Sequence, residues 1–275
     1  MNVIIPILIL GILGFFFGIS LAFSAKKFQV KADLRLEKIK ALLPGANCGA
    51  CGAAGCLGFA EGLLEDKFNL DACRVMEDKV KEEIAKILGK TFKQQTKKIA
   101  VLHCKGGKKV KDKFIYQGIN DCIASHLLLG GQKECFFGCL GLATCVKACP
   151  FGAIKMTEEG IPVIDENKCM ACNKCVQICP QKLFSLVPQN SKVYVACSSH
   201  DLGKDTKAVC PVGCIACTLC VKACKFDAIH IVDNLAVIDY NKCTSCGECV
   251  KVCPTKCIIM SKVNVRSETS NKGEI

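Results

Sequence analysis

Cysteine is the residue of this sequence whose number and spacing could do chemistry. The chain of 275 residues has 25 Cys, against 4 His and no Trp. A disulfide scaffold and a metal carrier are the two explanations for that content. The metal carrier fits better, because thiols as close as Cys169, Cys172 and Cys175 cannot each find a separate disulfide partner without strain, yet can converge on one centre. Free thiols in this number also indicate a reducing compartment.

Two runs have the spacing that binds a pair of 4Fe–4S clusters in bacterial ferredoxins. They are Cys169, Cys172, Cys175 and Cys179 before Pro180, and Cys243, Cys246, Cys249 and Cys253 before Pro254. The first three thiolates of such a run bind one cluster, and the fourth binds the other cluster of the pair. Each run therefore needs a partner run. For the second run the partner is complete, and it predicts two ligand sets: Cys214, Cys217, Cys220 with Cys253, and Cys243, Cys246, Cys249 with Cys224.

The partner of the first run is irregular. Leu142 stands where the complete run has Cys217, so Cys139 and Cys145 lack their middle ligand. Cys135 is the nearest substitute. The predicted sets are Cys135, Cys139, Cys145 with Cys179, and Cys169, Cys172, Cys175 with Cys149. A three-iron cluster is the alternative for the first of them. Zinc fits these runs less well, because each holds three or four Cys and no His.

A separate group of four cysteines comes earlier in the chain: Cys48, Cys51, Cys56 and Cys73. Glycines surround its first three members, and glycine lets backbone amides approach ligand sulfurs closely. This group predicts a fifth 4Fe–4S cluster, with zinc as the stronger rival here.

Five cysteines remain outside these sets. Cys257 lies in an apolar stretch and is interpreted as a small buried hydrophobe. The others could bind a sixth cluster, or could be structural thiols or replacement ligands: Cys104, Cys122, Cys197 and Cys210. His103 and His200, beside two of them, are interpreted as core or surface histidines. The prediction is thus five 4Fe–4S clusters, with a sixth allowed.

An internal repeat organises the second half of the chain. Four cysteines of one segment match four of another with identical spacing: Cys135, Cys139, Cys145 and Cys149 with Cys210, Cys214, Cys220 and Cys224. Short apolar strands ending in Cys precede both segments, at 99–104 and 193–197. Such self-similarity indicates duplication of one structural unit.

The first 25 residues carry no charged side chain and are almost wholly apolar. This is about the twenty residues that a spanning helix needs. A signal peptide is the alternative, but no basic residue precedes the apolar run. Lys26, Lys27 and Lys31 follow it, and positive residues stay cytoplasmic. We therefore expect a single-pass anchor in the cell (inner) membrane, with the rest of the chain on the cytoplasmic side.

Together these features predict an α+β protein with one transmembrane helix, a small helical 4Fe–4S domain and two tandem ferredoxin-like domains. The expected segments are an anchor at 1–25, a stalk at 26–43, a 4Fe–4S domain at 44–90, a first repeat at 91–189, a second at 190–260 and a disordered tail at 261–275. The net charge of +12 favours an anionic membrane surface or an acidic partner, and no aromatic-basic interleaving indicates nucleic acid. Candidate docking residues crowd beside the first repeat: Lys105, Lys108, Lys109, Lys111 and Lys113.

This layout resembles the B subunit of the Rnf complex, a membrane-bound ion-translocating ferredoxin oxidoreductase. The resemblance rests on the N-terminal helix, the loop from Leu43 to Gly52, Cys56 and Cys73, and the ferredoxin-type pairs. Two pairs, instead of one, resemble the long form of the family.

The resemblance implies an electron-transfer component of a translocase that takes electrons from reduced ferredoxin and relays them to membrane partner subunits, toward NAD. Its partners would be the other subunits, soluble ferredoxin and the lipid bilayer. The chain alone shows no dinucleotide fingerprint and no complete active site. Two alternatives stay open: a polyferredoxin component of another membrane redox complex such as a hydrogenase, and a complex that keeps a redox-sensing regulator reduced.

Overall fold

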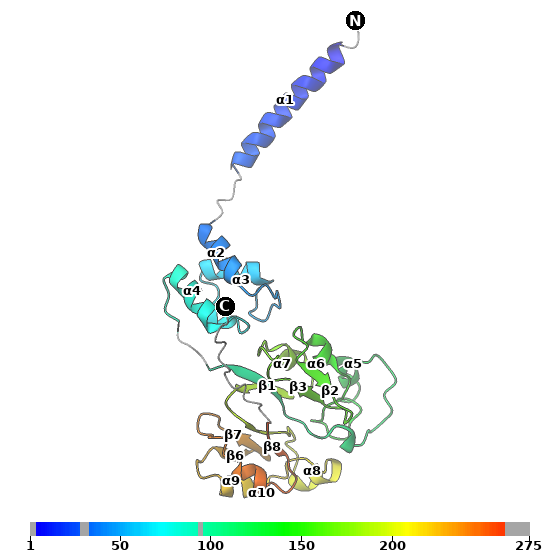
Figure 1. Cartoon of the computed structure of the whole chain (residues 1–275). Helices are drawn as coiled ribbons and strands as arrows, with labels where there is room; N and C mark the ends of the chain where they lie inside the picture. The colour runs from blue at the N-terminus through cyan, green and yellow to red at the C-terminus, as the bar shows by residue number, and fades with distance from the viewer. Residues whose placement is uncertain (1–3, 28–32, 93–95, 262–275) are drawn as a thin grey trace, which may run out of the picture.

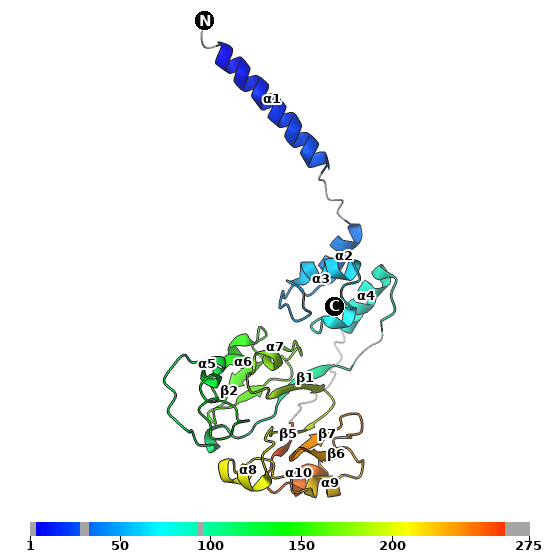
Figure 2. The same ribbon diagram turned by 180° about the vertical axis from the view of Figure 1, so that it is seen from behind.

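The computed structural model describes residues 4–27, 33–92 and 96–261. A long helix, a small helical unit and two mixed units of helices and strands follow one another away from the N-terminus (Figures 1 and 2). This content confirms the predicted α+β class. Apart from Ser261, the predicted disordered tail lies outside the described residues.

The first helix, α1 (Ile4–Lys27), is the predicted apolar segment. Twenty-four residues at 1.5 Å each give a length of about 36 Å, enough to cross a hydrocarbon core of about 30 Å. The stretch Ile7–Ser24 is predominantly apolar, with Ser20 and Ser24 as its polar residues, and none of it is buried against other described parts of the chain. Lys26 and Lys27 occupy the last turn. A helix of this kind associates with a membrane.

The small unit consists of α2 (Leu34–Leu42), α3 (Cys56–Leu64), the 3₁₀ turn η1 (Leu70–Ala72) and α4 (Asp78–Leu88). Its core is formed by Ile39, Phe59, Leu63 and Ile84, each at most 1% exposed. Because Ile39 belongs to α2, that part of the predicted stalk shares the core of the cluster-binding unit. Helix α4 ends at Leu88 and is capped by Gly89, which adopts φ +66°.

The first repeat contains eight short elements: β1 (Lys98–Leu102), η2 (Gly107–Lys109), α5 (Cys122–His126), α6 (Thr144–Ala148), β2 (Ile154–Met156), β3 (Pro162–Ile164), α7 (Lys174–Ile178) and β4 (Phe184–Pro188). The second contains seven: β5 (Val193–Val195), α8 (Gly203–Val209), α9 (Leu219–Ala223), β6 (Ile229–Val232), β7 (Leu235–Ile238), α10 (Glu248–Val252) and β8 (Ile258–Met260).

Both repeats have the same topology. In each, the first strand pairs with the last in an antiparallel ribbon, β1 with β4 and β5 with β8. A hairpin, β2–β3 or β6–β7, forms the second ribbon. Pairing first with last closes each repeat on itself, so the helices that follow the cysteine loops, such as α6 and α7, pack together in its interior. The matched topology is that of two copies of one unit.

The two repeats pack directly on each other through His103. Its Nδ1 lies 2.7 Å from the carbonyl oxygen of Val195, and its Nε2 lies 2.6 Å from Ser185 Oγ. Since a carbonyl only accepts, Nδ1 carries the proton and Nε2 accepts from the serine hydroxyl. Burial lowers the pKa of His103 below its ordinary value, which favours the neutral ring. His103 is thus a core histidine at the repeat interface.

Candidate metal centres

The loop before α3 carries the first group of cysteines. Cys48, Cys51, Cys56 and Cys73 line one hollow together with Leu43 and Phe59. Asn47 shapes the loop, because its Oδ1 accepts a hydrogen bond from the Cys56 amide at 2.8 Å. Gly55, at φ +138°, passes so close that an added Cβ would lie 3.0 Å from that oxygen. The amides of Met76 and Val75 bond to Cys73.

The second repeat assembles its two regular groups around short helices. Cys220 lies in α9, Cys249 lies in α10, and both face one apolar core. Cys243, Cys246 and Cys249 line a hollow with Cys224, as the ferredoxin spacing predicts. Backbone amides point at the sulfurs: Ala228 N lies 3.4 Å from Cys224 Sγ, and Ser245 N lies 3.4 Å from Cys243 Sγ.

One group of the first repeat has the same form. Cys169, Cys172 and Cys175 line a hollow with Cys149. The amide of Ala100, on β1, donates to Cys169 Sγ at 3.5 Å. Burial, with a contribution from the neighbouring thiols Cys169 and Cys172, raises the pKa of Cys175 to about 12.

The irregular group of the first repeat gains Cys122. This residue starts α5, where the Asp121 carboxylate caps the helix by accepting from the amides of Ile123 and Ala124. Thr144, the residue before Cys145, holds the same helix end: its Oγ1 accepts from the Cys122 amide at 2.7 Å and donates to Asp121 Oδ2 at 3.0 Å. Burial raises the pKa of Cys145 to about 12, and the nearby thiols Cys122 and Cys179 add to the rise.

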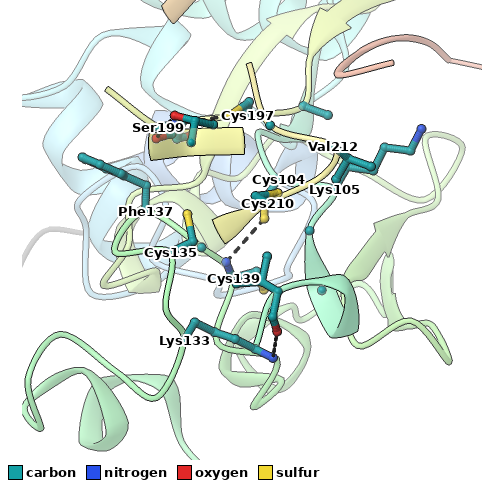
Figure 3. Close-up of a pocket in the computed structure, with 18 residues that line it drawn as sticks. Cys104, Lys105, Lys133, Cys135, Phe137, Cys139, Cys197, Ser199, Cys210 and Val212 are labelled. Carbon is teal, nitrogen blue, oxygen red and sulfur yellow. Dashed lines mark hydrogen bonds between the residues drawn. The ribbon is translucent and has the colours of Figure 1, made fainter. Parts of the chain in front are cut away.

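Four further thiols meet between the repeats: Cys104, Cys135, Cys197 and Cys210. They line one hollow together with Phe137 and Val212, and Cys139 of the irregular group lies at the same hollow (Figure 3). Burial raises the pKa of Cys135 to about 12, and the thiols that add to the rise are Cys104, Cys210 and Cys197.

This interface group is symmetric, because each repeat contributes the same two positions. Cys104 and Cys197 follow the first strand of their repeats, and Cys135 matches Cys210. The amide of Cys139 donates to Cys104 Sγ at 3.4 Å, and the matching amide of Cys214 donates to Cys197 Sγ at 3.2 Å. The dashed line between Cys139 and Cys104 in Figure 3 marks the first of these bonds.

The arrangement differs from the sequence assignment at two positions. Cys135, predicted to join Cys139, Cys145 and Cys179, lies with the interface group, whereas Cys122, predicted for the extra group, lies beside Cys145 and Cys139. The sequence holds a signal for this arrangement, since the spacing that matches Cys135 to Cys210 distinguishes both from the loop cysteines.

The donor chemistry of these groups fits iron–sulfur clusters. A thiol binds metal as the thiolate, and thiols crowded in an apolar site have high pKa values until metal charge compensates them. Amides aimed at the sulfurs supply the hydrogen bonds that such ligands accept. In the described part of the chain, no three His, Cys, Asp or Glu side chains are close enough to hold one metal ion, whereas a 4Fe–4S cube binds each thiolate to a different iron.

Comparison with protein families defines the class to which this fold and these groups belong. A family model of an Fe–S cluster domain matches residues 43–75. A model described as a 4Fe-4S dicluster domain matches residues 134–183 and again residues 213–257. The chain is therefore an iron–sulfur protein of the electron-transfer class, with 4Fe–4S domains in both repeats.

Curated relatives narrow the class to one family. The chain is 43% identical, over 93% of its length and 77% of the relative's, to the B subunit of the Na(+)-translocating ferredoxin:NAD(+) oxidoreductase complex of Acetobacterium woodii. It is 40% identical to the B subunit of the proton-translocating ferredoxin:NAD(+) oxidoreductase complex of Clostridium ljungdahlii, over 99% of each chain. The B subunit of the ion-translocating oxidoreductase complex of Methanosarcina acetivorans is 40% identical over 92% of this chain and 96% of its own.

The chain belongs to the family of B subunits of ion-translocating oxidoreductase complexes. This confirms the resemblance found in the sequence. The relatives' names differ in the coupling ion, sodium in one and protons in another.

Proposed function

We propose that this chain carries six 4Fe–4S clusters in one unbranched line, which takes electrons from reduced ferredoxin and delivers them to membrane subunits of a complex that reduces NAD. A 4Fe–4S cluster supplies reversible one-electron transfer, and the protein holds it, tunes it and excludes water. The observation that carries this proposal is that, from the first set to the fifth, a thiol of each group has a thiol of the next group as an electrostatic neighbour.

The proposed ligand sets follow the groups of thiols described above. They are Cys48, Cys51, Cys56 and Cys73; Cys149, Cys169, Cys172 and Cys175; Cys122, Cys139, Cys145 and Cys179; Cys104, Cys135, Cys197 and Cys210; Cys214, Cys217, Cys220 and Cys253; and Cys224, Cys243, Cys246 and Cys249. The fourth set joins the two repeats, and we call it the bridging set.

Contacts near the membrane end support this order. Cys48 is among the thiols that raise the pKa of Cys172, which connects the first set to the second. Cys145 is among those that raise the pKa of Cys175, which connects the second set to the third. The proposed line therefore begins in the unit that α1 ties to the membrane.

Contacts around the bridging set continue the line. Cys104 has the largest effect among the thiols that raise the pKa of Cys139, on the side of the first repeat. On the side of the second repeat, Cys197 has both Cys214 and Cys104 as neighbours. The bridging set is the proposed set that takes ligands from both repeats. It is therefore the proposed point at which electrons pass from one repeat to the other.

Solvent exposure supports a donor site at the far end. Cys217 and Cys246 are the exposed cysteines of the described chain. Cys217 belongs to the fifth set and Cys246 to the sixth. Lys225 and Lys251 lie on this surface and suit an acidic ferredoxin. Lys108 and Lys109, in η2 beside the bridging set, form the alternative docking surface.

The first set is the proposed exit to the membrane subunits, which lie where α1 anchors the chain. The described residues contain one helix long and apolar enough to cross a membrane, and Lys26 and Lys27 lie at its end; we therefore place the rest of the chain on the cytoplasmic side. Replacing Cys51 by Ala should leave ferredoxin able to reduce the other clusters but stop onward transfer. Onward transfer at the normal rate would place the exit elsewhere.

Iron and acid-labile sulfide per purified full chain test the proposal. Six clusters require about twenty-four irons. The paired variants Cys135→Ser and Cys122→Ser should each disturb one cluster, the bridging one and the third one respectively. About twenty irons in the unmodified chain would mean that one set, the bridging set first of all, holds no cluster, and about eight would remove both dicluster pairs.

A further inference from the structure

The residue four positions after the last cysteine of each ferredoxin motif occupies the same place in the fold four times. Those residues are Ala153, Leu183, Ala228 and Cys257. Each is at most 2% exposed. The backbone carbonyl of each accepts a hydrogen bond from the amide of another segment: Asp165, His103, Asp239 and Ala196 respectively. The backbone role is therefore constant, and Cys257 alone adds a side chain that can donate a hydrogen bond.

Cys257 points at the sulfurs of one ligand set. Its Sγ lies 3.6 Å from Cys253 Sγ, and it also contacts the thiol of Cys214. Both belong to the fifth proposed set, which is complete without Cys257 because Cys217 and Cys220 supply the other ligands. Around it lie apolar side chains, Val193, Val195 and Ile258 among them.

We propose that Cys257 remains a thiol and donates its S–H to a ligand sulfur of this set, which raises the reduction potential of the cluster held there. The inference rests on the proposed function. Hydrogen bonds to ligand sulfurs raise the potential because the positive end of the donor stabilises the charge added on reduction. The Thr255 hydroxyl, 3.7 Å from the Cys253 sulfur, acts in the same direction.

The matching position beside the sixth set lacks this donor. Ala228 stands there, with its amide 3.4 Å from Cys224 Sγ and no side-chain hydrogen to give. The fifth set therefore has the higher potential of the two in the second repeat. Electrons arriving at the exposed sixth set then move inward to the fifth set, toward the bridging set.

Redox titration of the full chain, followed by the electron paramagnetic resonance of the reduced clusters, tests this. In Cys257→Ala the iron content should stay at the unmodified value. At a fixed potential, the ratio of reduced to oxidised form should fall about threefold for one cluster. At 59 mV per tenfold change, this corresponds to a reduction potential lowered by about 28 mV. Cys257→Ser, which keeps a donor, should recover at least half of the shift.

A gain variant supplies the matched control. Ala228→Cys places a thiol beside the sixth set and should raise the potential of that cluster. Unchanged potentials in both Cys257→Ala and Ala228→Cys would reduce Cys257 to a packing residue, and loss of about four irons in Cys257→Ala would make it a ligand. An iron content of the unmodified chain below that of six clusters would instead contradict the proposed cluster assignment itself.

Discussion

Thr144→Val is the substitution that most sharply tests how the irregular group is held together. Val has nearly the shape of Thr but no hydroxyl, so the change removes the acceptor of the Cys122 amide and the donor to Asp121. The change leaves every proposed ligand thiol in place and acts only through the backbone that positions Cys122. If Cys122 belongs with Cys145, loosening its helix should destabilise that one cluster and leave the other clusters alone.

The expected magnitude follows from these two hydrogen bonds. A polar group left without a partner costs about 1–3 kcal/mol when buried. Cys122 is half-buried, so water replaces part of the loss, and about 1–2 kcal/mol is expected. That corresponds to a roughly five- to thirtyfold change in the equilibrium for local opening.

Iron release to a ferrous chelator under anaerobic conditions measures that opening. Thr144→Val should release about four irons, one cluster of the six, five- to thirtyfold faster than the unmodified chain. Thr157→Val is the matched control, because Thr157 Oγ1 donates to the Ile161 carbonyl oxygen in the turn after β2, away from the cysteines. Release kinetics identical in the two variants would refute the role of Cys122.

Three further predictions concern the repeat interface, the donor surface and the anchor. The pKa of His103 is lowered in the folded chain, so the neutral ring contributes stability above the unfolded pKa of about 6.5, and this contribution is lost as pH falls through the lower folded value. His103→Gln should therefore flatten this part of the pH dependence of the unfolding midpoint. An unchanged slope in the variant would contradict this role of His103. The double variant Lys225→Glu with Lys251→Glu reverses charge at the proposed donor surface and should slow reduction by ferredoxin. It should also weaken the salt dependence of that rate, because exposed charges are screened beyond about 8 Å at physiological salt. If the double variant Lys108→Glu with Lys109→Glu slows reduction more, the donor docks beside the bridging set. Exchanging α1 for an unrelated apolar helix of equal length should keep the chain on the membrane with the same ions moved per electron in assembled complex, and a lowered ratio would show that α1 lines the ion path.

Local spacing was enough to predict the parts of this protein that depend on local geometry. A run such as Cys243, Cys246 and Cys249 encodes its own loop, so the sequence alone leads to the ferredoxin repeats that the family comparison confirms. The apolar run of α1 is an equally local signal.

What the sequence did not predict depends on contacts between distant segments. Cys122 joins Cys145 through the hydroxyl of Thr144, a contact that spacing cannot reveal. A tertiary hydrogen bond decides this part of the arrangement.

The bridging set is the centre of the proposed electron line, and a map of iron positions in the anaerobically purified full chain tests it most directly. Diffraction data collected at the iron absorption edge locate iron independently of any assumed ligand. We predict six iron clusters, one of them between the repeats and held by Cys104, Cys135, Cys197 and Cys210. Five clusters with no iron at the repeat interface, or Cys135 bound in one cluster with Cys139, Cys145 and Cys179, would contradict it.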